Sequence, residues 1–400
     1  MAAYRTLDRL GDIAGQRALV RVDFNVPIDH DTGRITDDTR IRGALETIQT
    51  LVAKEARVIL MSHRGRPRQA NLHDSLRVVA NRLQELLDAP VDFVDDIVGT
   101  KARDAVQHLS PGHVLVLENL RFDPGEQAND PEFAKALAQL GDFYVDDAFG
   151  TAHRESASIV GVPRRLPSYA GHLLDRELST LARILDTPRK PYWLIVGGAK
   201  VSDKVGLLGH LLSQVDGIVI GGGMANTFLA AKGFSMGISK VEEDARDTAK
   251  ELVDHAKRLG IPVILPTDLV VTEAFRADAP ARVVAVDAVG SHEMALDLGP
   301  QSIDQIKDCL QDAQTILWNG PMGVFEWDAF SHATMEVART LAELPAAVVV
   351  GGGDSVAAVH RAGVMDQLTH VSTGGGATLE LLEGKTLPGV AALGTYNDLH

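Results

Sequence analysis

One pattern recurs through the second half of the chain: an apolar, strand-like stretch runs directly into glycines. It is found in Leu194–Lys200, Ile218–Gly223, Val348–Asp354 and Val371–Ala377. Glycine after a strand lets the backbone approach a bound anion closely, and the helix that follows presents unpaired N–H groups to that anion. The pattern therefore predicts strands connected by helices, with phosphate-binding turns where the strands end.

The strand-like stretches of the first half end in polar and cationic side chains instead. These are Asp23 and Asn25, then His63, Arg64 and Arg66, then Glu118, Asn119 and Arg121. Arginine clusters bind anions through their side chains rather than through the backbone. Two anion sites built in two ways indicate two phosphorylated substrates, one bound by each half.

Length and composition narrow the class of protein. A chain of 400 residues exceeds one ordinary core, so two domains are expected. The formal charge of −15 argues against a nucleic-acid surface. No apolar run approaches the roughly 18 residues of a membrane span, and the N-terminus lacks the apolar core of a secretion signal. Cys309 is the only cysteine, which excludes an intrachain disulfide and favours a reducing compartment. We therefore expect a cytoplasmic protein without nucleic-acid or membrane partners.

Apolar strands alternate with helical patterns along the whole chain, which predicts right-handed βαβ units and mostly parallel sheets. The strands expected in the first half are Ala18–Val22, Arg57–Met61, Val91–Val94, His113–Leu117 and Asp142–Val145. Those expected in the second half are Tyr192–Val196, Gly217–Ile220, Pro262–Leu265, Arg282–Val286, Gln314–Trp318, Ala346–Val350 and Leu368–Ser372. Their continuous apolar character is typical of sheets that are covered on both faces.

The best domain boundary lies near Leu178–Pro191. A helical run, Leu173–Leu185, precedes Thr187–Pro191, where two prolines within four residues stop a helix. A helix between two α/β units is a plausible hinge element.

Standard nucleotide fingerprints are missing. Gly384–Thr386 reads like the end of a Walker A motif, but Leu379 stands where that motif needs its first glycine. None of the glycine runs completes a G-x-G-x-x-G pattern, so an ordinary dinucleotide site is unsupported.

Two lysines, Lys200 and Lys204, lie four residues apart at the start of a helix predicted from Ser202 to Gln214. On a helix they share one face, and at its N-terminus they are unfavourable for the helix dipole unless an anion is bound. The alternative is a pair of solvated lysines on an exposed turn. The preceding Gly197 and Gly198 favour phosphate binding.

Three further segments carry candidate nucleotide chemistry. Asp354 and Ser355 follow Gly351–Gly353 where a helix begins, so Asp354 is either a helix cap, a Mg²⁺ ligand or both. Gly374, Gly375 and Gly376 open another helix, and their amides are placed to stabilise a phosphoryl group in transit. Glu326 suits a ribose hydroxyl, with a plain surface glutamate as the alternative.

Together these segments resemble phosphoglycerate kinase almost from end to end. The resemblance is carried by Arg21–Pro27, Asp38–Ile41, Ser62–Pro67, Glu118–Phe122, Ala152–Arg154, Val196–Val201, Trp318–Glu326, Gly351–Asp354 and Ser372–Ala377, in that order. It implies two doubly wound, parallel-sheet (Rossmann-like) α/β domains joined by a helical hinge. Residues 1–172 would bind 3-phosphoglycerate or 1,3-bisphosphoglycerate, 173–190 would form the hinge, and 191–387 would bind Mg-ADP or Mg-ATP. Residues 388–400 would return to the first domain, and a monomer is the family expectation.

The resemblance also implies residue roles. The phosphoglycerate would be bound by Asp23, Asn25, Arg40, His63, Arg64, Gly65, Arg66, Arg121 and Arg154. The nucleotide would be bound by Lys204, Glu326, Gly352, Gly353, Asp354 and Ser355, with Mg²⁺ on Asp354. The transferring phosphoryl group would be stabilised by Arg40, Lys200, Lys204, Gly374, Gly375 and Gly376. The sequence departs from the family at Glu155 and Ser156, beside Arg154.

These roles predict reversible transfer of an acyl phosphate to Mg-ADP. The reaction needs no general base, and the sequence offers no triad or carboxylate pair for one. Two alternatives remain at this point: an NAD-dependent dehydrogenase on a similar fold, and a non-catalytic protein that binds phosphorylated metabolites.

Overall fold

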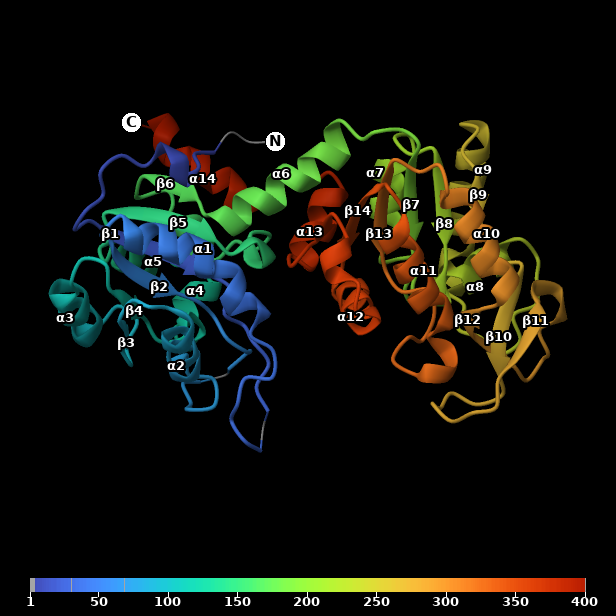
Figure 1. Ribbon diagram of the computed structural model, residues 1–400, viewed down its shortest axis with the longest axis horizontal. Coiled ribbons are helices and arrows are strands. Elements are labelled where there is room, and N and C mark those ends of the chain that lie inside the picture. The colour runs from blue at the N-terminus through green and yellow to red at the C-terminus, as the bar shows by residue number, and fades with distance from the viewer. Residues whose placement is uncertain (1–3, 30, 68, 400) are drawn as a thin grey trace. The chain divides into compact units, whose positions relative to one another are not determined.

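The computed structural model describes residues 4–29, 31–67 and 69–399 (Figure 1). The chain forms two compact units. The first comprises Met1–Ser179 together with Thr386–His400, and the second comprises Thr180–Lys385. The division falls inside helix α6 (His172–Asp186), the helix predicted as the hinge element.

The first unit is built on a six-stranded parallel sheet. Its strand order is β3-β4-β2-β1-β5-β6. The strands are β1 (Arg17–Val22), β2 (Arg57–Met61), β3 (Val91–Phe93), β4 (Val114–Val116), β5 (Phe143–Asp147) and β6 (Ser168–Ala170). All but the first residue of β1 are buried, as expected for a strand covered on both faces. The short edge strand β6 was not predicted.

Helices surround this sheet. They are α1 (Thr39–Ala53), α2 (Arg77–Leu86), α3 (Thr100–His108), α4 (Pro124–Gln127) and α5 (Pro131–Ala138), with a π-helical turn at Ala157–Gly161. Local sequence explains where α5 begins. The carboxylate of Asp130 accepts a hydrogen bond from the amide of Phe133 at 2.7 Å, and proline occupies the first helical position.

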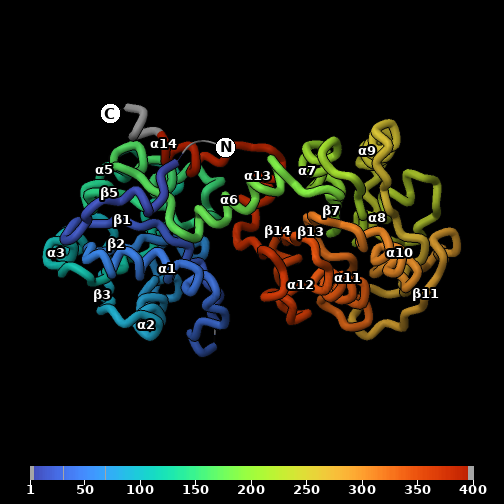
Figure 2. The backbone as a smooth tube through the Cα atoms, turned by 45° about the horizontal axis from the view of Figure 1, so that its top comes forward, coloured from blue at the N-terminus to red at the C-terminus, as the bar shows by residue number. Residues whose placement is uncertain are grey.

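The last helix, α14 (Pro388–Leu399), belongs to the first unit. The amide of Gly389 donates to the carbonyl of Ala152 at 2.8 Å. A Cβ at Gly389 would lie 2.8 Å from the side chain of Ile159, so glycine permits this close approach. Figures 1 and 2 both show α14 beside the first unit's elements.

The second unit also contains a six-stranded parallel sheet, in the order β15-β14-β13-β7-β8-β9. Its strands are β7 (Tyr192–Val196), β8 (Gly217–Ile220), β9 (Val263–Ile264), β13 (Thr315–Asn319), β14 (Ala347–Gly351) and β15 (His370–Val371). The helices are α7 (Val205–Leu211), α8 (Gly222–Ala231), α9 (Arg246–Arg258), α10 (Pro300–Leu310), α11 (His332–Glu343), α12 (Gly353–Ala362) and α13 (Gly376–Leu382).

A separate three-stranded antiparallel sheet differs from the sequence prediction. Its order is β11-β10-β12, with β10 (Asp268–Thr272), β11 (Arg282–Ala285) and β12 (Met294–Leu298). The sequence pattern predicted a strand at β11 but missed β10 and β12. Both lie in a stretch broken by glycine, proline and charged residues, where tertiary pairing decides whether an extended segment becomes a strand.

The winding direction of each parallel sheet reverses at one place. In the first unit the chain builds outward from β1 to β2 on one side and to β5 on the other. In the second unit the same reversal separates β8 and β13 around β7. Open α/β sheets bind ligands outside the carboxyl ends of their strands at such a switch point. One ligand site is therefore expected at β1 and β5, and another at β7 and β13.

Candidate functional site

At the switch point of the first unit lies a pocket of about 140 Å³. It is lined by Arg21, His63, Arg121, Glu126, Gln127, Arg154, Glu155 and Ser156. Of the predicted phosphoglycerate residues, the structure brings His63, Arg121 and Arg154 together here. Three guanidinium groups in so small a volume favour an anionic ligand. Glu155, where the sequence departs from the family, is one of two carboxylates in the lining.

Arg21 was missed as a site residue. It is only 2% exposed and stands among the buried apolar residues of strand β1. Its guanidinium donates to Ser158 Oγ at 2.9 Å and approaches His63 Nδ1 at 3.1 Å. A buried charge needs partners, so an arginine between the apolar residues Val20 and Val22 was the signal that the sequence offered.

Arg121 shows the electrostatic character of this pocket. It is largely buried and donates to the backbone carbonyl of Gly65. Burial, together with the positive charges of the neighbouring Arg154, Arg21 and Arg66, lowers its pKa to about 10. Mutual repulsion among guanidinium groups makes a bound anion more favourable, because the anion relieves it.

Arg40, Asp23 and Asn25 lie at the segment ends that lead into this site. Arg40 is in the first turn of α1 and forms an ion pair with Asp23, with 2.7 Å between Nη1 and Oδ2. Asn25 Oδ1 accepts the amide of Gly65 at 2.9 Å. Gly65 has a φ of +61°, a left-handed conformation that favours glycine. Asn25 therefore fixes the turn that precedes Arg66.

The side chains of Arg64 and Arg66 do not line the pocket. Arg64 is buried, and its guanidinium donates to the backbone carbonyls of His73 and Ser75. That bonding holds the 73–75 loop and directs Arg64 away from the other arginines. Arg66 is exposed, yet close enough to affect the pKa of Arg121. The sequence analysis assigned Arg64 and Arg66 to one site because they are close together in the chain. In the structure, the backbone turn directs their side chains to different places.

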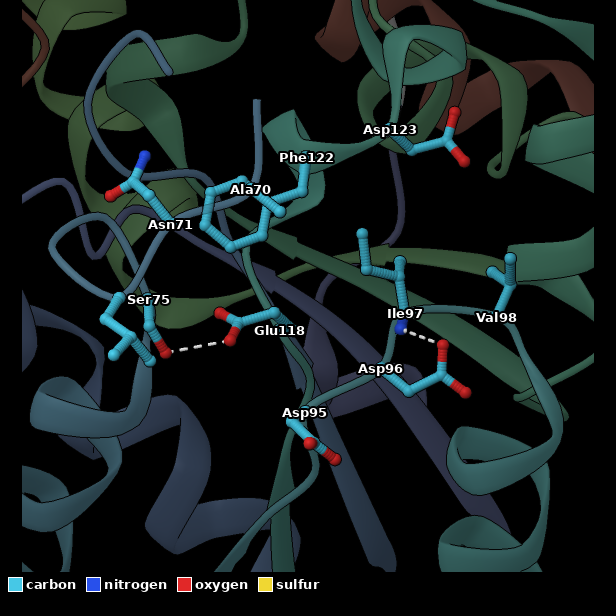
Figure 3. A pocket seen from close by; sticks show the side chains of 11 residues that line it. Ala70, Asn71, Ser75, Asp95, Asp96, Ile97, Val98, Glu118, Phe122 and Asp123 are labelled. Atoms are coloured by element: carbon cyan, nitrogen blue, oxygen red, sulfur yellow. Dashed lines mark hydrogen bonds between the residues drawn. The ribbon is translucent and has the colours of Figure 1, made fainter. Parts of the chain in front are cut away.

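A larger cleft of about 510 Å³ lies elsewhere in the first unit (Figure 3). Two carboxylates of its lining, those of Glu118 and Asp96, accept hydrogen bonds from nearby backbone amides. Glu118 accepts hydrogen bonds from Ser75 Oγ and the amide of Leu76, at 2.8 and 2.9 Å. Asp96 accepts from the amides of Ile97, Gly99 and Ala102, which fixes the start of α3. These bonds explain the acidic lining structurally, and no predicted site residue lines this cleft.

The second unit has a cavity of about 590 Å³ at its own switch point. Predicted nucleotide residues Glu326 and Asp354 line it, and both side chains are exposed to it and to solvent. The rest of the lining is largely glycine and apolar: Gly198, Ala199, Gly222, Gly223, Ile238, Phe275, Leu296, Pro321 and Val324 are among its residues. A mostly apolar cavity with few polar groups suits a base and sugar.

Gly222 and Gly223 received no site role from the sequence, and the structure places both in the cavity wall. Gly222 has a φ of +65°, and a Cβ there would lie 2.6 Å from the backbone nitrogen of Gly198. The two glycine turns after β7 and β8 therefore pack against each other, which only glycine allows.

The sequence predicted that the two candidate phosphate lysines share one helical face, but in the structure they do not. Helix α7 begins at Val205, so Lys204 precedes it and Lys200 lies in an exposed turn. Glu242 explains the late start, because its carboxylate accepts from the amides of Val201 and Ser202 and from Ser202 Oγ. These bonds hold residues 201–202 outside the helix.

Lys204 is half-buried, and its ammonium donates to the side-chain oxygen of Asn319. Burial lowers the pKa of Lys204. Asn319 is completely buried at the end of β13, and its Nδ2 donates to the carbonyl of Gly351 at 2.9 Å. Asn319 thus connects the lysine to the glycine turn after β14. The sequence analysis assigned it no role, although it stands between Trp318 and Gly320 in a motif that was noted.

The turn after β14 leads into α12. Gly352 has a φ of +94°, and Gly353 begins the helix with open space around its Cβ position. Asp354 therefore lies in the first helical turn rather than at the cap. Ser355 is buried, and its hydroxyl accepts the amide of Gly320. That bond ties the turns after β13 and β14 together.

The glycine turn after β15 precedes α13, which begins at Gly376. The amide of Gly374 donates to Ser372 Oγ at 3.2 Å, so it is used within the turn. Gly375 has a φ of +51°, and Gly376 is exposed. The three amides are thus not equivalent, and those of Gly375 and Gly376 are the better candidates for a ligand.

Within residues 4–29, 31–67 and 69–399, no cluster of three or more histidine, cysteine or acidic side chains is arranged to hold a metal ion. A single carboxylate such as that of Asp354 is enough for a Mg²⁺ that takes most of its ligands from nucleotide phosphates and water. Among the same residues, no helix is both long and apolar enough to cross a membrane.

Known phosphoglycerate kinases match this chain over nearly its whole length. The phosphoglycerate kinase family profile matches residues 7–385. The phosphoglycerate kinase of Moorella thermoacetica is 53% identical over 384 residues, 96% of this chain and 97% of that protein. That of Herpetosiphon aurantiacus is 50% identical over 381 residues, 95% and 96% of the two chains. The solved phosphoglycerate kinase of Coxiella burnetii superposes with a TM-score of 0.88 at 40% identity, covering 98% of this chain and 99% of that one. The chain therefore belongs to the phosphoglycerate kinase family.

Proposed function

We propose that this phosphotransferase moves the acyl phosphate of 1,3-bisphosphoglycerate to ADP, giving 3-phosphoglycerate and ATP, and catalyses the reverse reaction. The observation that carries the proposal is the pair of unlike sites, one per unit. An arginine-lined pocket lies at one switch point, and a glycine-lined, largely apolar cavity lies at the other.

The arginine-lined pocket suits the phosphoglycerate. Arg21, Arg121 and Arg154 supply fixed positive charge, and His63 supplies a further polar contact. Asp23 and Asn25 are placed to orient hydroxyl groups, while Gly65 and Arg66 follow the turn that Asn25 fixes. Arg64 contributes by holding that turn, not by contact with the ligand.

The cavity of the second unit suits the nucleotide. We assign the base and sugar to the apolar and glycine wall and to Glu326. The phosphates then lie near Gly352, Gly353 and the start of α12, where the helix dipole favours negative charge. Lys204 contributes a cation beside them, and Ser355 fixes the adjoining turn. Lys200 is exposed on the neighbouring turn and is free to reach the phosphates.

We assign Mg²⁺ to Asp354, the acidic side chain of the cavity that lies in the first turn of α12. One protein carboxylate is enough for Mg²⁺ bound mainly through nucleotide phosphates. The ion would neutralise part of the charge on those phosphates.

The transfer itself needs little covalent help. An oxygen of the ADP β-phosphate attacks the acyl phosphorus, the bond from phosphorus to the carboxyl oxygen breaks, and the carboxylate leaves with the electron pair. The nucleophile is already ionised and the leaving group is stable, so no proton has to be removed. The protein's task is to position the groups and offset their charge. We give that task to Arg40, Lys204 and the amides of Gly375 and Gly376.

Because the phosphoryl group passes directly between two substrates, turnover requires the sites to approach and exclude water. We infer a hinge motion at α6, which contains the boundary between the units. A monomeric, cytoplasmic enzyme accords with this scheme.

The test is to follow ATP formation from 1,3-bisphosphoglycerate and ADP, and ADP formation from 3-phosphoglycerate and ATP, each with and without Mg²⁺. We expect both reactions, and both should depend on Mg²⁺. Binding of both ligands without turnover would favour the non-catalytic alternative. Nicotinamide reduction without added ATP would favour a dehydrogenase, which family membership already argues against.

A further inference from the structure

The contact between Arg21 and His63 constrains the chemistry of the histidine. Arg21 Nη2 lies 3.1 Å from His63 Nδ1, and the two residues are 2% and 3% exposed. A guanidinium group has N–H donors only and stays protonated in proteins. Nδ1 must therefore be the acceptor in this bond. A proton on Nδ1 would point two donors at each other inside the protein.

The surroundings of His63 also favour a neutral imidazole ring. Burial, together with the positive charges of Arg21, Arg121, Arg154 and Arg40, lowers its pKa well below the ordinary 6.5. Glu126 and Glu155 are the carboxylates that line the same pocket. The ring is therefore neutral, and its single proton is on Nε2.

Arg21 is itself held in place by a buried chain of hydrogen bonds. Its Nε donates to Ser158 Oγ at 2.9 Å, and that hydroxyl donates to Glu126 Oε1 at 2.6 Å. The other oxygen of Glu126 accepts the amide of Ser158 at 2.9 Å. Nη1 donates to the carbonyl of Val22. Ser158 and Glu126 are at most 2% exposed, so this chain fixes the direction of the guanidinium group.

We propose that Arg21 is a positioning residue that holds His63 as the neutral Nε2–H tautomer. The imidazole then offers the anion in the pocket one N–H donor and no charge of its own. Naming that anion as phosphoglycerate rests on the proposed function. As a consequence, the positive charge of the pocket comes from its arginines, which stay protonated. Anion binding therefore does not vary with the protonation of His63 near neutral pH.

The first experiment reads the ring directly. In the full-length protein labelled with ¹⁵N-histidine, long-range ¹H–¹⁵N correlation spectra report which ring nitrogen carries a proton. His63→Gln identifies the signals by their loss. We expect an unprotonated Nδ1, a protonated Nε2 and no titration between about pH 6 and about pH 8. A proton on Nδ1 at neutral pH would overturn the proposal, whatever any variant shows.

The second experiment removes the constraint. In Arg21→Met, the His63 ring should also populate the tautomer with its proton on Nδ1, because the donor to Nδ1 is lost. KM for 3-phosphoglycerate should then rise by roughly threefold or more, while kcat changes less. Arg17→Met is the matched control, since Arg17 lies on the same strand but pairs with Asp142 at the surface. Equal effects of the two substitutions would contradict a specific role of Arg21.

Adding 3-phosphoglycerate to the labelled protein separates this proposal from the proposed function. A saturable shift of the His63 Nε2–H signal supports both. If the ring shows the expected tautomer but does not respond, the phosphoglycerate assignment fails and the action of Arg21 on His63 stands.

Discussion

The ammonium group of Lys204 donates a hydrogen bond to the side-chain oxygen of Asn319. Asn319 in turn donates to the carbonyl of Gly351, so one buried side chain connects the lysine to the glycine turn that precedes α12. The lysine and the turn come from opposite sides of β13, and Asn319 fixes their spacing. This contact is neutral on the asparagine side, which leaves the positive charge of Lys204 available to a phosphate.

Replacing Asn319 with aspartate should weaken nucleotide binding. The new carboxylate would hold Lys204 as an ion pair, compete with phosphate for it, and face the carbonyl of Gly351 without a proton to donate. We expect the affinity for Mg-ADP to fall by about tenfold, near 1.4 kcal/mol. Titration calorimetry measures this. The affinity of the same variant for 3-phosphoglycerate is the internal control and should be unchanged; a folded variant with normal Mg-ADP affinity would contradict the role given to Asn319.

Arg40→Ala should reduce turnover sharply while the protein stays folded. Arg40 is half-buried, and its ion pair with Asp23 is partly open to solvent, so the pair contributes at most about 1 kcal/mol to stability. Loss of a group that offsets charge on the phosphoryl in transit should lower kcat by about 10²–10³-fold. Steady-state kinetics and urea unfolding check both statements.

The matched control for Arg40 is Arg42→Ala, on the same helix. Arg42 pairs with Asp38 at the surface and has no place in the proposed mechanism. Its substitution should leave kcat close to that of the parent protein. Comparable losses in the two variants would mean that disturbance of α1, not the loss of Arg40, causes the effect.

Gly353→Ala tests whether phosphates approach the backbone at the start of α12. A Cβ at Gly353 meets no protein atom within 4 Å, so the fold should accept it, with a gain in unfolding free energy of up to about 1 kcal/mol. The same methyl group would occupy the space that we assign to the phosphates. It should therefore weaken Mg-ADP binding by about tenfold.

Gly209→Ala is the control for Gly353→Ala. Gly209 lies inside α7 and also has open space around its Cβ position. It should give a similar stability gain without a change in nucleotide affinity. Unaltered binding in Gly353→Ala would remove this helix start from the phosphate site.

Asp297 should make the second unit less stable as the pH rises. It is 3% exposed, its Oδ1 has no hydrogen-bond partner among the described residues, and burial raises its pKa to about 7. Between the ordinary value of 3.8 and about 7, the folded state keeps a proton that the unfolded chain has released. The free energy of unfolding therefore falls through this window and levels off above it.

Asp297→Asn should remove most of that pH dependence, because an amide stays neutral and its oxygen can still accept the amide of Ala333. Relative to the parent protein, the variant should gain a few kcal/mol at most between about pH 5 and about pH 8. All tryptophans (Trp193, Trp318 and Trp327) lie in the second unit, so their fluorescence follows its unfolding in urea. The exposed Asp366→Asn is the control. An identical pH profile in Asp297→Asn and the parent protein would disprove the assignment.

Much of the architecture could be predicted from sequence because continuous apolar strands and glycine turns are local signals. The strands of both parallel sheets, apart from the short β6, were found in this way. The antiparallel strands β10 and β12 were missed, since pairing between segments, not local pattern, makes them strands. Likewise, the local pattern predicts a helix from Ser202, but α7 begins only at Val205. The amide of Ser202 donates instead to the carboxylate of Glu242, 40 residues away.

Local sequence patterns were enough to predict the two-part α/β design, the family resemblance and which kinds of side chain gather at the strand ends. The direction in which each of those side chains points depended on contacts made in the folded chain. Those contacts turned Arg64 onto the carbonyls of His73 and Ser75, placed Arg21 against His63, and joined Lys204 to Asn319. The physical reason is that residue type and strand position are encoded locally. The direction of a buried charged group instead depends on which distant donors and acceptors satisfy it, and only the folded chain brings these together.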